Sequence, residues 1–109
     1  VPYRGNFTRG IFTSIYMKFD HEIKDIKSIY KDFYKNHPFT FLSNNDINLK
    51  EVINTNNCHV KIEFHKRIIH ITTVLDNLIK GASGQAVQNL NIIYGYEESL
   101  GLNFKGSIY

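Results

Sequence analysis

The residues with the clearest chemical potential lie near the end of the chain, in the stretch KGASGQAVQN from Lys80 to Asn89. Glycines, alanines and a serine stand there between a lysine and several side-chain amides. Free N–H groups at a helix start built from such small residues can bind a phosphate or an amide of a ligand. The same residues also permit close packing of a helix, although each glycine costs it about 1 kcal/mol. The stretch by itself favours neither interpretation.

The glycine pattern matches no known phosphate loop. The chain contains neither the GxGxxG sequence of dinucleotide-binding folds nor the lysine motif of Walker loops. Gly81 and Gly84 form only G-x-x-G, which carries little information. The chain therefore has no nucleotide-binding fingerprint of its own.

The histidines and the single cysteine form no recognisable metal or nucleophile motif. His65 and His70 are expected on adjacent strands, and neither an HExxH sequence nor a second cysteine accompanies them. Cys58 precedes His59, but neighbouring residues of a strand point to opposite faces of the sheet, so this histidine is poorly placed to activate the thiol. We expect surface or turn histidines, a partly buried structural thiol and no metal.

Alternating hydropathy predicts the strands that must position these residues. Ile11 to Phe19 alternates with period two, and Val60 to Phe64 does the same before a turn at residues 65–67. Ile68 to Leu75 is apolar at nearly every position, which predicts a strand covered on both faces. The short aromatic run Phe39 to Leu42 predicts a further strand.

Two helices follow from apolar residues spaced three to four apart. The first is expected from Glu22 to Asn36, with Asp20 as its N-cap. Lysines at helical spacing mark its solvent-exposed face: Lys24, Lys27, Lys31 and Lys35. The second begins at the capping residues Asp76 and Asn77 and ends at Gly95. Its apolar stripe comprises Leu78, Ala82, Ala86, Leu90 and Ile93.

The order strand, helix, three strands, helix predicts an α+β fold. We expect a mostly antiparallel or mixed sheet and two main helices lying on one face. The 109 residues suit one domain, and 42% hydrophobic residues exclude a disordered chain. The net charge of +3 comes from lysines interleaved with acidic residues, so no nucleic-acid partner is expected. No apolar run is long enough for a membrane span, and the lone cysteine fits a reducing, cytoplasmic compartment.

Three segments resemble one enzyme family. LDNLIKGASGQAVQNLNIIYGYEESLGL (75–102) closely resembles the C-terminal segment of N-acetyl-gamma-glutamyl-phosphate reductase, FTRGIFTSIY (7–16) is similar to its RGI strand, and LKEVINTNNCHV (49–60) fits the segment between them. The resemblance covers essentially the whole chain in one register, and DNLxKGAxGQAVQNxN is a specific motif. The family more often reads PHLxPMxRGI at the start, where this chain has Tyr3 and Asn6 in place of the histidine and proline.

The resemblance implies NADPH-dependent reduction of N-acetyl-glutamyl 5-phosphate to the semialdehyde, with release of phosphate, in arginine biosynthesis. It identifies residues 1–109 as the C-terminal fragment of the catalytic and dimerisation domain, ending in the helix that returns to an absent Rossmann domain. The family's GCYP-type and HRHxPE-type segments do not occur here, so Cys58 and the histidines inherit no catalytic role. We expect no reductase activity from these residues alone, because they supply neither nucleophile nor fingerprint.

The resemblance also implies particular binding residues. Asn77 matches the position that meets the nicotinamide carboxamide in related semialdehyde dehydrogenases, and Gly81, Ala82 and Gly84 would form the close approach to NADP. Arg9 of the RGI segment is the candidate for binding the acidic substrate. No catalytic residue and no metal ligand is predicted.

The partners implied are NADPH, N-acetyl-glutamyl phosphate and a second copy of the protein, because the sheet of this family often builds subunit contacts. Without its partner domain, the final helix should expose apolar surface. The alternative is a non-catalytic binding or assembly module derived from the same fold.

Overall fold

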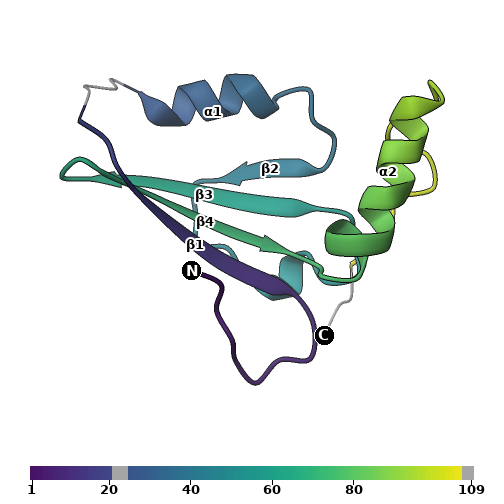
Figure 1. Cartoon of the computed structure of the whole chain (residues 1–109), viewed down its shortest axis with the longest axis horizontal. Helices are drawn as coiled ribbons and strands as arrows, with labels where there is room; N and C mark the ends of the chain where they lie inside the picture. Colours follow the sequence, from purple (N-terminus) through teal and green to yellow (C-terminus); the bar gives the residue numbers. More distant parts are fainter. Residues whose placement is uncertain (21–24, 107–109) are drawn as a thin grey trace.

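The computed structural model describes residues 1–20 and 25–106, which form a four-stranded sheet with a helix on its face and another at its end (Figure 1). The strands are β1 (Ile11–Lys18), β2 (Thr40–Ser43), β3 (Cys58–His65) and β4 (Ile68–Leu75), in the spatial order β1-β4-β3-β2. β4 pairs antiparallel with β1 and β3, whereas β2 pairs parallel with β3. The predicted α+β class with a mixed sheet and two main helices is confirmed.

β4 occupies the centre of the sheet because it is apolar on both faces. Ile69 and Ile71 are buried on one face, and Thr72 and Val74 on the other, as its nearly continuous hydropathy predicted. The turn between β3 and β4 is tight, since Lys66 and Arg67 both have positive φ, 45° and 67°. A two-residue turn with positive φ at both positions matches the right-handed twist of the two strands that it joins.

The first helix, α1 (Ile26–Tyr34), packs over one face of the sheet (Figure 1). Asp25 caps it, because its Oδ1 accepts a hydrogen bond from the Ser28 N–H at 3.1 Å. The expected cap Asp20 is therefore wrong. The expected helix start at Glu22, together with Lys24, lies outside the described residues. The helix closes a core formed by Ile26, Val60, Ile62, Ile69 and Ile71, with Phe19, Tyr30, Leu42 and Cys58 packed around it.

The second helix, α2 (Gly84–Ile93), follows a π-helical turn, Ile79–Ser83, in which the N–H groups of Gly81 and Ser83 donate to carbonyls five residues earlier. It stands beyond the end of β4 and not over the sheet (Figure 1). The expectation that both helices lie on one face of the sheet is therefore wrong, because only α1 covers a face. Gly95, with φ of +70°, ends the helix region as predicted.

The predicted apolar stripe of this last helical region exists and faces solvent. Its members Leu78, Ala82, Ala86, Leu90 and Ile93 are all exposed, and the buried residues of α2 are Gly84 and Asn91. Ile93 keeps 78% of its surface accessible. The expectation of exposed apolar surface on the final helix is confirmed. In the described part of the chain, no helix is long and apolar enough to cross a membrane.

Candidate functional site

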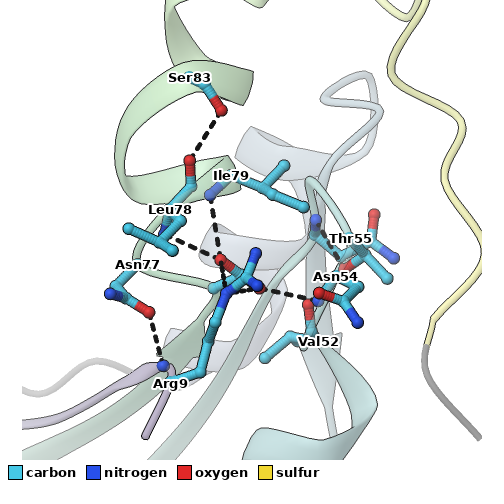
Figure 2. Close-up of polar contacts among 11 residues, drawn as sticks. Arg9, Val52, Asn54, Thr55, Asn77, Leu78, Ile79 and Ser83 are labelled. Carbon is cyan, nitrogen blue, oxygen red and sulfur yellow. Dashed lines mark hydrogen bonds and ion pairs between the residues drawn. The ribbon is translucent and has the colours of Figure 1, made fainter.

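The buried carboxylate of Asp76 connects the elements around the end of β4. Figure 2 labels its partners Arg9, Asn54, Leu78 and Ile79. Its Oδ1 accepts hydrogen bonds from the N–H groups of Leu78 at 2.8 Å and Ile79 at 3.0 Å, and its Oδ2 accepts one from the Asn54 N–H at 2.7 Å. Arg9 Nε lies 3.1 Å from Oδ2 and 3.2 Å from Oδ1. One side chain thus joins the segment before β1, the loop before β3 and the start of the last helical region.

These donors keep Asp76 ionised. Burial alone would raise the pKa of this carboxyl, but the backbone N–H groups and Arg9 outweigh that effect, so the pKa lies below its ordinary value. Asp76 was predicted as a helix-capping residue, and its bonds to Leu78 and Ile79 confirm that role. The bonds to Arg9 and Asn54 were not predicted.

Asn77 makes a second connection to the same approach segment. Its Oδ1 accepts a hydrogen bond from the Gly10 N–H at 2.7 Å (Figure 2). Gly10 has φ of +105°, a conformation that suits glycine. Because Oδ1 faces Gly10, the Asn77 Nδ2 group is left without a hydrogen-bond partner among the described residues. The Arg9–Gly10 and Asp76–Asn77 pairs thus interlock, although they are separated by most of the chain.

The three small residues predicted at the cofactor have different surroundings. Gly81 and Ala82 are exposed on the π-helical turn. Gly84 is buried, and a Cβ there would lie 2.3 Å from Asn56 Oδ1 and 2.7 Å from Ile79 Cγ2. Gly84 therefore serves close packing, whereas a ligand can reach Gly81 and Ala82. A π-helical turn is often found at functional sites.

A network of polar side chains that the sequence did not predict connects α2 to its surroundings. Lys80 Nζ donates to Gln88 Oε1 at 2.7 Å, and the Asn56 amide donates to the same oxygen at 3.1 Å. Gln88 Nε2 in turn donates to Glu98 Oε1. Burial lowers the pKa of Lys80, although the thiol of Cys58 and the carboxylate of Glu98 act in the opposite sense. Of the amides in the stretch Lys80 to Asn89, Gln88 is thus held by a lysine, a carboxylate and the amide of Asn56.

Cys58 is a partly buried free thiol, as expected. It is partly buried beside the α1-facing core, and burial raises its pKa more than the charge of Lys80 lowers it. His59 turns to the opposite face, where its Nδ1 lies 3.1 Å from Glu51 Oε2. A raised pKa disfavours the thiolate that nucleophilic catalysis needs. Among the described residues, no group of three His, Cys, Asp or Glu side chains could hold a metal ion.

A second polar group on β1, β3 and β4 resembles a hydrolase triad in outline. His70 Nε2 lies 3.1 Å from Ser14 Oγ, and its Nδ1 lies 3.5 Å from Glu63 Oε2. However, Ser14 keeps only 2% of its surface accessible, and the ring of Tyr16 stacks on His70 at 4.5 Å between centroids. This group is a packed structural network. The expectation of surface or turn histidines holds for His65 and not for His70, which is partly buried in β4.

A pocket of about 320 Å³ opens beside Arg9. It lies between the approach to β1 and the 3₁₀ turn Leu49–Glu51, and it is lined by Asn6, Phe7, Thr8, Arg9, Leu49, Lys50 and Ile53. Arg9 and Lys50 are the charged residues of this lining, so the pocket suits an anion. The predicted substrate residue Arg9 therefore lines a pocket, and its Nε is held by Asp76. Whether it binds substrate stays a prediction.

Comparison with known proteins gives the class of this chain. Residues 1–77 match the family model described as "Semialdehyde dehydrogenase, dimerisation domain". The chain therefore belongs to the semialdehyde dehydrogenase family, in agreement with the mixed sheet and two helices.

The three curated relatives compared with this chain share one name. The chain is 54% identical over 105 residues to the N-acetyl-gamma-glutamyl-phosphate reductase of Karelsulcia muelleri, covering 96% of this chain and 32% of that enzyme. It is 49% and 47% identical to the enzymes of the same name from Christiangramia forsetii and Azobacteroides pseudotrichonymphae, covering all of this chain and 34% of each. The chain spans about a third of the length of the curated relatives it matches.

Proposed function

We propose that this chain is the C-terminal part of an NADPH-dependent N-acetyl-gamma-glutamyl-phosphate reductase and is inactive by itself. The observation that carries the proposal is identity of 47–54% with three such reductases over 96–100% of this chain. The reaction would convert N-acetyl-glutamyl 5-phosphate to N-acetyl-glutamate 5-semialdehyde and phosphate in the cytoplasm. The thiol with a raised pKa at Cys58 supports the view that the nucleophile comes from elsewhere in the enzyme.

Asn77 and the exposed small residues are the proposed cofactor side of the site. A carboxamide oxygen of NADP would accept a hydrogen bond from Asn77 Nδ2, which has no partner among the described residues. Gly81 and Ala82 present little side chain there, so a ring can approach the backbone closely. The bound cofactor would supply the hydride. The role of this chain is to hold the ring in one orientation, which the Gly10–Asn77 bond makes rigid.

Arg9 is the proposed contact for the acidic substrate. Its Nε is anchored on buried Asp76, and its two terminal nitrogens have no hydrogen-bond partner among the described residues. A guanidinium fixed at one end and open at the other can bind an oxyanion through a fork of two N–H groups. We further propose that the enzyme is a homo-oligomer, in keeping with the dimerisation-domain match.

A chimera tests the proposed function directly. The C-terminal third of the Karelsulcia muelleri reductase is replaced by this chain, and phosphate-dependent reduction of NADP by the semialdehyde is measured. We expect turnover from the chimera and none from the chain alone, because only the chimera combines nucleophile and cofactor domain. A soluble, folded chimera without turnover would refute the reductase assignment. It would favour the alternative, a non-catalytic binding or assembly module.

A single substitution in the chimera tests the cofactor contact. Asn77→Asp keeps an oxygen for the Gly10 N–H but replaces the free amide donor by a second acceptor. We expect the KM for NADPH to rise about tenfold, as loss of one hydrogen bond from a binding site implies. Gln85→Glu, on an exposed residue of α2, adds the same charge and should change the KM little. An unchanged KM for Asn77→Asp would remove Asn77 from the cofactor site.

A further inference from the structure

The positive charge of Arg9 is largely balanced by a neighbouring carboxylate. The guanidinium of Arg9 lies 3.1 Å from the buried carboxylate of Asp76, so the two groups together are close to neutral. A substrate phosphoryl group carries nearly two negative charges at neutral pH. Arg9 alone offers directional hydrogen bonds for such a group, but little net positive charge.

Lys50 supplies the missing charge in the same pocket. It is exposed, and its Nζ has no partner among the described residues, whereas the neighbouring Glu51 is engaged by His59 at 3.1 Å. The lining of the pocket contains no carboxylate. Lys50 is therefore the uncompensated cation of this pocket.

The position of Lys50 is fixed by the fold. Asn48 Oδ1 accepts a hydrogen bond from the Lys50 N–H at 3.0 Å and caps the 3₁₀ turn. The turn packs directly on the approach to β1, because a Cβ at Gly10 would lie 2.6 Å from Leu49 Cδ2 and 3.1 Å from Ile53 Cδ1. Leu49 and Ile53 are also walls of the pocket. The backbone of Lys50 is thus held in register with the Arg9–Gly10 pair, which Asp76 and Asn77 anchor.

We propose that Lys50 acts with Arg9 as a paired oxyanion site for the acidic substrate. This inference rests on the proposed function and adds a specificity residue to it. Arg9 orients the oxyanion through its terminal N–H groups, and Lys50 provides the net charge. The remaining lining suits an acylated amino acid: Asn6 and Thr8 can hydrogen-bond an amide, and Phe7, Leu49 and Ile53 offer apolar contact. The shared chemistry is an oxyanion, either the phosphoryl group or a carboxylate.

Titration of the chain with two probes distinguishes a phosphoryl group from a carboxylate as the bound oxyanion. Inorganic phosphate and N-acetylglutamate are each added at low ionic strength, and the backbone amide NMR signals of residues 8–10 and 49–51 are followed. We expect saturable shifts confined to these segments. Phosphate alone would assign the pair to the phosphoryl group, and N-acetylglutamate alone would assign it to a carboxylate.

Substitutions of Lys50 decide whether it takes part. Lys50→Met should weaken binding about tenfold, as loss of one charge-assisted contact implies, and Lys50→Arg should restore it. Lys18→Met, an exposed lysine at the far end of β1, removes the same charge and should leave binding unchanged. Binding of neither probe, or equal binding by Lys50→Met, would overturn the inference.

The two proposals fail separately. Loss of turnover in the chimera with intact Lys50-dependent anion binding would refute the reductase assignment alone. Turnover in the chimera without such binding would refute the paired oxyanion site alone.

Discussion

Replacing Asp76 by asparagine is the sharpest test of how the site is held together. The substitution keeps the size of a fully buried side chain and removes its charge and one acceptor. If the remaining oxygen keeps the N–H groups of Leu78 and Ile79, the new amide N–H₂ faces the Asn54 N–H, while Arg9 Nε, which also donates to the remaining oxygen, loses the charge of its partner. Two donors then oppose each other in a buried place.

The expected loss follows from these contacts. Removing the acceptor of a buried N–H costs about 1–3 kcal/mol. The pair with Arg9, whose side chain is 31% exposed, adds no more than about 1 kcal/mol after solvent screening. We therefore expect Asp76→Asn to lower the free energy of unfolding by about 3 kcal/mol. That is a large fraction of the roughly 5–15 kcal/mol that stabilises a typical domain.

Urea unfolding followed by circular dichroism measures this loss. With a slope of about 1.5–2 kcal/mol per molar urea, the midpoint should fall by about 1.5–2 M at pH 7. Asp46→Asn, which removes an exposed carboxylate paired with Lys61, is the matched control and should move the midpoint little. An equal midpoint for Asp76→Asn and the parent chain would refute the reasoning.

The same comparison has a predicted pH dependence. The folded-state pKa of Asp76 is lowered, so its charge stabilises the fold fully above the unfolded value of about 3.9. That contribution is lost as pH falls through the lower folded-state pKa. The stability gap between the parent and Asp76→Asn should therefore be constant near neutral pH and shrink below about pH 4. A gap that grows on acidification would contradict the assigned direction.

Two further predictions concern the last helical region. Gly84→Ala places a Cβ 2.3 Å from Asn56 Oδ1, so overpacking should lower the free energy of unfolding by about 1–3 kcal/mol, and with it the urea midpoint, despite the better helix propensity of alanine. Gly81→Ala, whose Cβ would meet its nearest atoms at 3.3 Å, should cost less, and the reverse order would contradict the packing argument. Ile93→Lys removes an apolar residue that is 78% exposed, so it should reduce self-association in sedimentation velocity without lowering the urea midpoint. Gln85→Lys adds the same charge on the same helix as a control, and an equal effect of both would assign the change to charge alone.

The sequence predicted the strands well because their signals are local. Ile68–Leu75 was predicted with the bounds that the structure has, since a continuous apolar run needs no knowledge of its neighbours. The parallel pairing of β2 with β3 could not be predicted from the residues of either strand, because it depends on how the intervening chain folds. The N-cap of α1 was misplaced for a related reason: Asp20 and Asp25 are equally good capping residues by type, and among the described residues it is Asp25 that binds a helix N–H.

The functional roles of the predicted site residues stay a prediction, but the fold shows how these residues are held. Asn77 and Arg9 were selected by resemblance, and the structure brings their neighbours Gly10 and Asp76 together with them. No spacing rule could have paired these residues, because the contact depends on the register of β1 against β4. Whether each of Gly81 and Gly84 is exposed or closely packed also depends on which residues lie opposite it. Only the fold shows that Asn56 occupies the space over Gly84.

The Arg9–Asp76 and Gly10–Asn77 hydrogen bonds each join residues 67 positions apart, which has a consequence for how the chain folds. Contacts of such long range require the intervening chain to be closed into a loop first, and they slow folding relative to helical proteins. During synthesis, the segment before β1 must wait for residues 76 and 77 to leave the ribosome. Arg9, Gly10, Asp76 and Asn77 should therefore acquire their positions late, after β3 and β4 have formed their hairpin. Amide hydrogen exchange during refolding should protect the hairpin before it protects Gly10.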